Sequence, residues 1–273
     1  MTYLAHYAGI AKPEEKTTIK VIADSLQIIH GAYQQWKLFT KDFEVDDVFY
    51  NASKTDALYD SAVEILGKVK VSFRSVDLEE ILNKIPFEDK ASGLFLSALH
   101  NTTDIETLDG IFKYHITGYR LAEGKNIICR EGSKIEYLAR YAVGGYIENH
   151  GTVDWMADCA SGGMQVNHGT VDWMASFSSG GVQVNNGTVH FMAYSSSGGM
   201  SVNHGTVEWM ALSASGGMQV NFGKAINNYC KPLPKEILKR LRRKTLTLKN
   251  LTPEQLQTFD WKTFEEEMKE MLP

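Results

Sequence analysis

The chain has 273 residues, of which 43% are hydrophobic and 22% charged, and its formal net charge is −5. This composition is typical of a soluble protein with a buried core, and the acidic balance disfavours nucleic acid or an anionic membrane as partner. No apolar run approaches the roughly 20 residues of a membrane helix. The N-terminus lacks a signal-peptide pattern, so we expect a cytoplasmic protein, although leaderless export would leave no pattern.

Residues 1–120 are predicted to form a mainly helical domain. From residue 12 to 39, apolar residues recur at three- and four-residue steps, which predicts a long amphipathic helix that begins near Pro13. Shorter helices are predicted at 56–66, 77–85 and 90–100, and polar–apolar alternation predicts a short strand at 68–73.

A near-identical phrase repeats every eighteen residues between Gly145 and Gly223. Its copies read GGMQVNHGTVDWMASFSS from Gly162, GGVQVNNGTVHFMAYSSS from Gly180 and GGMSVNHGTVEWMALSAS from Gly198. Such a fixed short period indicates a repeat architecture, here residues 121–224. A fainter copy at 134–139 falls in register with 152–157, and it predicts a terminal, capping coil.

The columns of the repeat predict which side chains face the core. Strand residues two apart share a face, so Val171 and Trp173 are expected to point inward and Asp172 outward. The same alternation predicts that Met164 and Val166 point inward, whereas the glutamine and asparagine of that strand point outward. Small and glycine residues at the remaining corner suit a tight turn with positive φ.

Eighteen residues suit one coil of a β-solenoid, with coils stacked about 4.8 Å apart. Like residues would then form ladders, including one of asparagines at 149, 167, 185, 203 and 221. An antiparallel meander is the alternative, because Asn186-Gly187 between two valines is also a hairpin signal. The fold class is therefore α+β: a helical domain, a short β-solenoid (or meander), and C-terminal helices that cap it.

The phrase N-x-G-T-V resembles the coils of β-helices of the filamentous-haemagglutinin and autotransporter type. The resemblance covers about eighty residues, from Gly145 to Gly223. It implies a β-helical fold and carries no activity, cofactor or site residue over to this chain.

Two further columns are candidate partner-binding positions. The methionine column is either buried by a bend after the aromatic residue or exposed as an interaction stripe, since methionine suits adaptable surfaces; it comprises Met156, Met174, Met192 and Met210. The polar column suggests stacked catalytic carboxylates, ligands for a cation, or solvated positions, of which we favour the last; it comprises Asp154, Asp172, His190 and Glu208.

Histidines recur in the turn at 150, 168 and 204, with asparagine at 186. Stacked imidazoles suggest a metal site, but the asparagine interrupts the column, and a solvent-facing turn is the preferred interpretation. We therefore expect no metal and no cofactor.

Residues 225–273 are predicted to form a C-terminal helical cap. A basic helix spans 235–244 and an acidic one about 261–272. The basic cluster suggests an acidic partner or nucleic acid, although a solvated helix face is the preferred interpretation; it comprises Lys239, Arg240, Arg242, Arg243 and Lys244.

The preferred function is a non-enzymatic interaction protein. A rigid repetitive solenoid suits a protein partner or another copy of the chain, and a homo-oligomer is expected. One alternative is an inhibitor or effector, of phage or pathogen type, that blocks a host protein. Another is an enzyme that acts on polysaccharide along the solenoid, with Asp154 and Asp172 as acid and base.

Overall fold

The structure is a computed structural model, and it describes residues 13–41, 51–69 and 91–230. It also describes isolated C-terminal positions, namely 235, 236, 239, 242, 243, 255, 263 and 267. The chain divides into two compact units, Met1–Leu108 and Asp109–Pro273, which are described separately below.

Three helices make up the described part of the first unit: α2 (Pro13–Thr40), α4 (Ala52–Gly67) and α6 (Ser92–Thr102). They confirm the helices predicted at 12–39, 56–66 and 90–100. Asn51 caps α4, because its side chain accepts a hydrogen bond from the backbone N–H of Lys54. The helix predicted at 77–85 lies outside the described residues, as does most of the strand predicted at 68–73.

Aromatic side chains form the core of this unit. Tyr33 and Trp36 of α2 are fully buried, and each ring packs on Phe95 of α6, at 5.3 and 5.6 Å between centroids. Their polar atoms are satisfied: the Trp36 indole N–H donates to the Leu58 carbonyl at 3.0 Å, and the Tyr33 hydroxyl lies 2.6 Å from Ser92 Oγ. The predicted apolar stripe of α2 is therefore core over its described side chains, from Leu26 to Trp36. No described helix is both long enough and apolar enough to cross a lipid bilayer.

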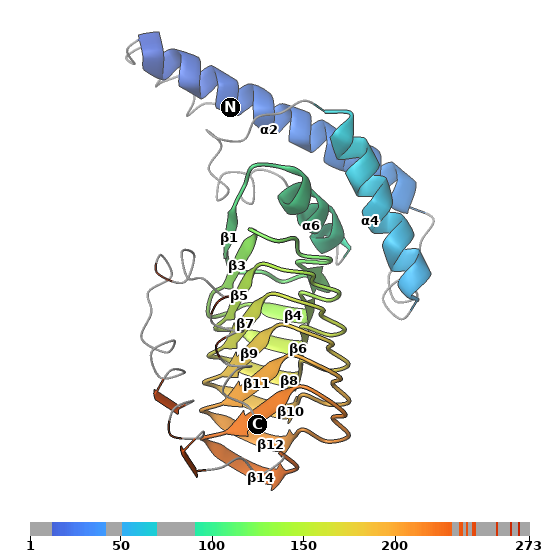
Figure 1. Cartoon of the computed structure of the whole chain (residues 1–273). Coiled ribbons are helices and arrows are strands. Elements are labelled where there is room, and N and C mark those ends of the chain that lie inside the picture. Colours follow the sequence, from blue (N-terminus) through green and yellow to red (C-terminus); the bar gives the residue numbers. More distant parts are fainter. Residues whose placement is uncertain are drawn as a thin grey trace. The chain divides into compact units, whose positions relative to one another are not determined.

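The second unit is a parallel β-solenoid of two seven-stranded sheets, and Figure 1 shows its coils stacked one on another. Sheet A runs in the order β1 (Thr107–Gly110), β3 (Asn126–Cys129), β5 (Tyr146–Asn149), β7 (Met164–Asn167), β9 (Val182–Asn185), β11 (Met200–Asn203) and β13 (Met218–Asn221). Sheet B runs in the order β14 (Lys224–Asn228), β12 (Thr206–Met210), β10 (Thr188–Met192), β8 (Thr170–Met174), β6 (Thr152–Met156), β4 (Lys134–Leu138) and β2 (Ile116–Thr117).

Each repeat is one coil, and like residues lie above like. Val171 of β8 pairs with Val189 of β10, which pairs with Val207 of β12, all in parallel register. This register confirms the solenoid and excludes the antiparallel meander. The 134–139 copy is in register as predicted, but β2 precedes it in sheet B, so it is the second coil and not the terminal one.

The predicted asparagine ladder holds each coil to the next. Each side-chain amide donates from Nδ2 to Oδ1 of the asparagine eighteen residues later, at 2.8 to 2.9 Å, along Asn149, Asn167, Asn185, Asn203 and Asn221. The first three also donate to a turn carbonyl in their own coil, and Asn203 donates to the Lys224 carbonyl of the next coil. The oxygens of all four accept the turn N–H two residues on. The ladder therefore provides hydrogen-bond partners for the buried polar groups of the turn and also links each coil to the next.

Backbone approaches backbone at the same turn. A Cβ built on Gly169 would lie 2.1 Å from the Gly151 carbonyl oxygen, and one on Gly205 would lie 2.1 Å from the Gly187 oxygen. Such distances are far inside van der Waals contact, so a side chain at either position would force the coils apart. Glycine is required here by the stacking distance.

The inward face differs from the one that simple alternation predicts. In β8, Val171 and Met174 are buried while Trp173 is half-exposed, so the aromatic residue does not point into the core as predicted. The alternation fails because the chain turns at the next residue, Ala175, whose φ of 58° is left-handed. In sheet A the prediction was wrong in another way: Gln165 and Asn167 were expected to face solvent, but both are fully buried.

We predict that Asn185→Ala lowers the free energy of unfolding by about 2–3 kcal/mol, because it leaves buried donors and acceptors of two neighbouring asparagines unpaired. The half-buried Asn186 lies outside the ladder, and Asn186→Ala, the matched control, should cost less than about 1 kcal/mol. Chemical denaturation of the three chains measures both values. Equal losses for the two variants would show that the ladder does not hold the coils.

Candidate functional site

Sheet B carries the exposed side chains of the repeat. The five residues of β6, β8 and β10 share one pattern, with the first and third exposed, the fourth half-exposed, and the second and fifth buried. In contrast, all four residues of β5, β7, β9 and β11 in sheet A are buried. Of the two sheets, sheet B is therefore the one whose described strands present a repetitive surface to solvent.

The polar column runs along this face, and its predicted outward position is confirmed. Asp154, Asp172 and His190 are exposed, and Glu208 is half-exposed. The column is longer than predicted, because Glu136 of β4 and His115 before β2 continue it in register. The alignment of 134–139 with 152–157 already contained the signal for Glu136.

Two histidine–carboxylate pairs lie along this column, and neighbouring carboxylates repel one another around Asp154. His115 Nδ1 is hydrogen-bonded to Glu136 Oε2, and His190 Nδ1 lies 3.4 Å from Glu208 Oε2. Between these pairs, partial burial and the charges of Asp172 and Glu136 raise the pKa of Asp154, while His115 acts in the opposite direction. The column therefore concentrates negative charge around Asp154.

A ladder of aromatic rings lies beside the polar column. Its first ring, Tyr137, is buried, and the half-exposed position of the four rings that follow was missed from sequence. The aromatic ladder comprises Tyr137, Trp155, Trp173, Phe191 and Trp209, with ring centroids 6.2, 4.9, 4.0 and 6.2 Å apart and interplanar angles of 7–17°. Tyr229 stacks on Trp209 and extends it. Because the ring faces cover one another, a ligand meets mainly ring edges.

Two more rings widen this apolar surface at the corner after sheet B. Tyr194 packs edge-to-face against Trp173 at 5.3 Å and against Phe177 at 5.6 Å. The Phe177 side chain is 52% exposed, which is unusual for a large apolar group. The result is a continuous aromatic surface bordered by carboxylates.

The methionine column does not contribute to the surface. Met156, Met174, Met192 and Met210 are completely buried, so the partner-binding role considered for them is wrong, and the alternative of a bend that buries them holds. The physical reason is the left-handed residue that follows each methionine, for example Ala193 with a φ of 58°.

The basic helix is described only in part. Lys239, Arg242 and Arg243 are helical and exposed, whereas Arg240 and Lys244 lie outside the described residues. The partner-binding role predicted for this cluster stays a prediction. The acidic helix predicted at 261–272 also lies outside the described part of the chain, apart from single positions.

The three cysteines are free thiols. Burial is the main cause that raises the pKa of Cys159 and of Cys230, each to about 11. Burial also raises the pKa of Cys129, which has no exposed surface. At neutral pH all three are protonated and poor nucleophiles.

Comparisons of the chain with protein-family models, with curated proteins and with solved structures found no match. The β-solenoid is established by the coil geometry itself. The resemblance to haemagglutinin and autotransporter coils is thus confirmed at the level of fold, and no family is shown.

We predict that Asp154→Asn raises the melting temperature at pH 7 by roughly 1–3 °C. A carboxyl whose pKa is raised in the folded state destabilises that state once it ionises. The loss of folding stability is therefore present at neutral pH, and it vanishes as the pH falls below the pKa of the carboxyl in the unfolded chain, which is near 4. Thermal unfolding of both chains from pH 3 to pH 8 checks this. A neutral-pH melting temperature that is unchanged or lower would contradict the repulsion around Asp154.

Proposed function

We propose that this chain is a non-enzymatic interaction protein that binds a protein partner through the outer face of sheet B. The observation that carries the proposal is the pairing of the aromatic ladder with the polar column over five consecutive coils. Contiguous exposed apolar surface bordered by polar groups is characteristic of interaction sites.

The chemistry of this face favours a partner that is apolar at its centre and basic at its rim. Tryptophan and tyrosine dominate the binding energy of protein interfaces because they bury a large area at low entropic cost. The carboxylates of Asp154 and Asp172 stand beside Trp155 and Trp173, where they would attract lysine or arginine and steer the encounter. Nucleic acid is disfavoured by the same charges.

The stacked backbone makes the surface rigid. Each aromatic ring and each carboxylate is attached to a strand that is hydrogen-bonded on both sides within sheet B. Little conformational entropy is then lost on binding, which favours affinity for a given contact area.

We predict that removing the charge of the column weakens partner binding about tenfold, in line with three exposed charge contacts of a fraction of a kcal/mol each. The test variant carries Asp154→Ser, Asp172→Ser and Glu208→Ser. The control carries Ser161→Lys, Ser179→Lys and Ser215→Lys, which gives the same change of three charges at exposed positions of another corner with the same coil spacing.

The wild type, the test variant and the control are each immobilised, and the proteins that each retains from an extract of the source cell are compared. The retained partner is then titrated against each of the three purified chains. Support requires a partner whose dissociation constant rises about tenfold for the test variant and less than twofold for the control. Equal affinity for all three chains would contradict the proposal.

A second candidate function, self-assembly, is favoured by the last coil. Strand β14 ends sheet B and, among the described strands, pairs only with β12. Its outward Ile226 takes the position after Glu208 in the polar column and is 66% exposed, and Tyr229 is 53% exposed. A terminal strand that carries exposed apolar side chains of this kind is suited to edge-to-edge pairing with a second copy.

Self-assembly predicts that Ile226→Lys shifts a dimer toward monomer in sedimentation velocity at micromolar concentration. Ile111 is 58% exposed in the first coil, so Ile111→Lys is the matched control and should leave the distribution unchanged. A wild-type chain that is monomeric at all concentrations would exclude this function and leave the partner-binding proposal intact.

A further inference from the structure

Glu148 breaks the repeat at a position that carries isoleucine in the coil before it, at Ile128, and valine in the coils after it. It pairs in register with Val166, which pairs with Val184, and Val202 and Val220 follow. Glu148 is nevertheless only 8% exposed. A carboxylate buried at a valine position is costly unless charged or hydrogen-bonding partners compensate its lost hydration.

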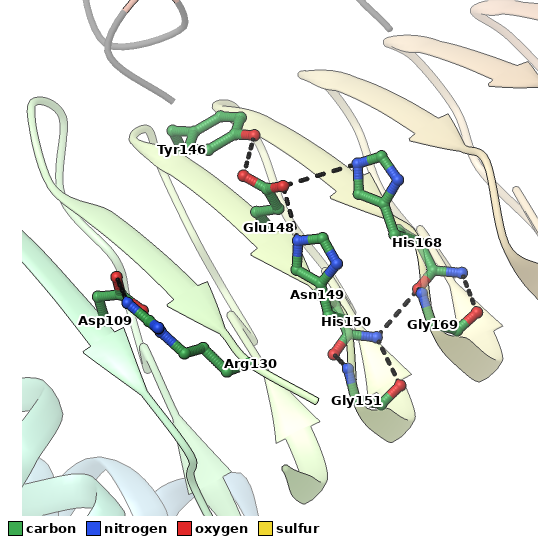
Figure 2. Close-up of polar contacts among 10 residues, drawn as sticks. Asp109, Arg130, Tyr146, Glu148, Asn149, His150, Gly151, His168 and Gly169 are labelled. Atoms are coloured by element: carbon green, nitrogen blue, oxygen red, sulfur yellow. Dashed lines mark hydrogen bonds and ion pairs between the residues drawn. The ribbon is translucent and has the colours of Figure 1, made fainter. Parts of the chain in front are cut away.

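Two histidines and a tyrosine converge on this carboxylate, as Figure 2 shows. His150 Nε2 lies 2.8 Å from Glu148 Oε1, and His168 Nε2 lies 3.7 Å from the same oxygen. The Tyr146 hydroxyl donates to the other oxygen, Oε2, at 2.8 Å. The carboxylate is thus oriented by the tyrosine so that Oε1 faces both imidazoles.

The coil register brings the two histidines together. His150 and His168 follow β5 and β7 at equivalent turn positions, and their rings stack at 4.8 Å with an interplanar angle of 6°. The next coils carry Asn186 and His204 at this position, and His204 stacks on Phe222 instead. Glu148, His150 and His168 therefore form a local cluster in two coils, unlike the columns that run along the solenoid.

We propose that Glu148, His150 and His168 bind one divalent transition-metal ion, with Zn²⁺ as the best fit. One potential ligand atom of each residue lies within 4.8 Å of those of the other two, and Glu148 Oε1 faces Nε2 of both histidines. Two imidazoles and one carboxylate match the donor preference of zinc and its neighbours, whereas Ca²⁺ and Mg²⁺ prefer oxygen donors alone.

The distances suit this ion. Ligands bound at about 2.0–2.1 Å in tetrahedral geometry lie about 3.3 Å apart, and the two carboxylate–imidazole separations, 2.8 and 3.7 Å, lie on either side of that value. To bind one ion, the two histidine rings would rotate so that their nitrogens converge, and both side chains are exposed. Three protein ligands leave the fourth position for water or for a group of a partner.

Tyr146 acts as an outer-shell group. Its hydroxyl donates to Glu148 Oε2 at 2.8 Å and so holds the carboxylate with Oε1 toward the two imidazoles. Partners that orient a ligating carboxylate typically contribute about 10–100-fold to metal affinity. No metal was expected from the sequence because the histidine column alone is interrupted by Asn186, and the sequence does not show that the Glu148 carboxylate faces His150 and His168.

Isothermal titration of the full, untagged, chelator-treated chain with ZnCl₂ tests the site, together with the absorption spectrum of the Co²⁺-loaded chain. We expect one equivalent to bind, and Glu148→Gln and His168→Asn each to weaken binding by on the order of 100-fold or more, because each removes one of three ligands. Tyr146→Phe should weaken it by about tenfold. His204→Asn is the matched control and should leave affinity unchanged.

His168→Asn places in this coil the residue that the next coil carries at Asn186, so the variant keeps a turn that the solenoid already accommodates. Its circular dichroism should match that of the wild type, which keeps the test decisive even where Glu148→Gln fails to fold. Absence of saturable binding tighter than about 0.1 mM in the wild type would overturn the proposal. Undiminished Zn²⁺ affinity in folded His168→Asn would overturn it equally, because the ion would then bind elsewhere.

Discussion

The close approach of successive backbones at the turn between the two sheets is the constraint on which the solenoid depends. The carbonyl oxygen of Gly151 occupies the space that a Cβ of Gly169 would need, and the same relation recurs one coil later at Gly187. Once the turns touch in this way, each coil must copy the path of the one before it. The asparagine ladder then follows from the same spacing, since an amide chain closes at 2.8–2.9 Å only when like residues lie above like.

This constraint separates two kinds of position. Turn glycines, ladder asparagines and the inward valines are held by contacts with the coils on either side, so a change at one position disturbs two interfaces. The outer face of sheet B has no such restriction, and its polar column passes through aspartate, histidine and glutamate without altering the backbone. The type of side chain can therefore vary on this face with little effect on the fold, which suits the outer face of sheet B to be the candidate partner surface.

The period and the ladders were predictable from sequence because they depend only on identity at a fixed step. Which face each residue takes was not, because it depends on where the strand ends. Alternation along Val171, Asp172 and Trp173 predicts an inward tryptophan, but the left-handed Ala175 turns the chain so that Met174 takes the core position. The cluster around Glu148 was missed for a related reason. Its three ligands come from one strand and two turns, and only the register between coils shows that they meet.

The two proposed sites respond differently to the number of coils. A coil added in register between β9 and β11 would lengthen the polar column and the aromatic ladder by one step each, and so enlarge the partner surface in proportion. The same insertion would leave the Glu148 cluster unchanged, because all its groups belong to the coils of β5 and β7. Repetition is thus the source of the extended surface, and a departure from repetition is the source of the metal site. A solenoid built in this way can gain or lose coils, and so change the length of its partner surface, without altering the Glu148 cluster.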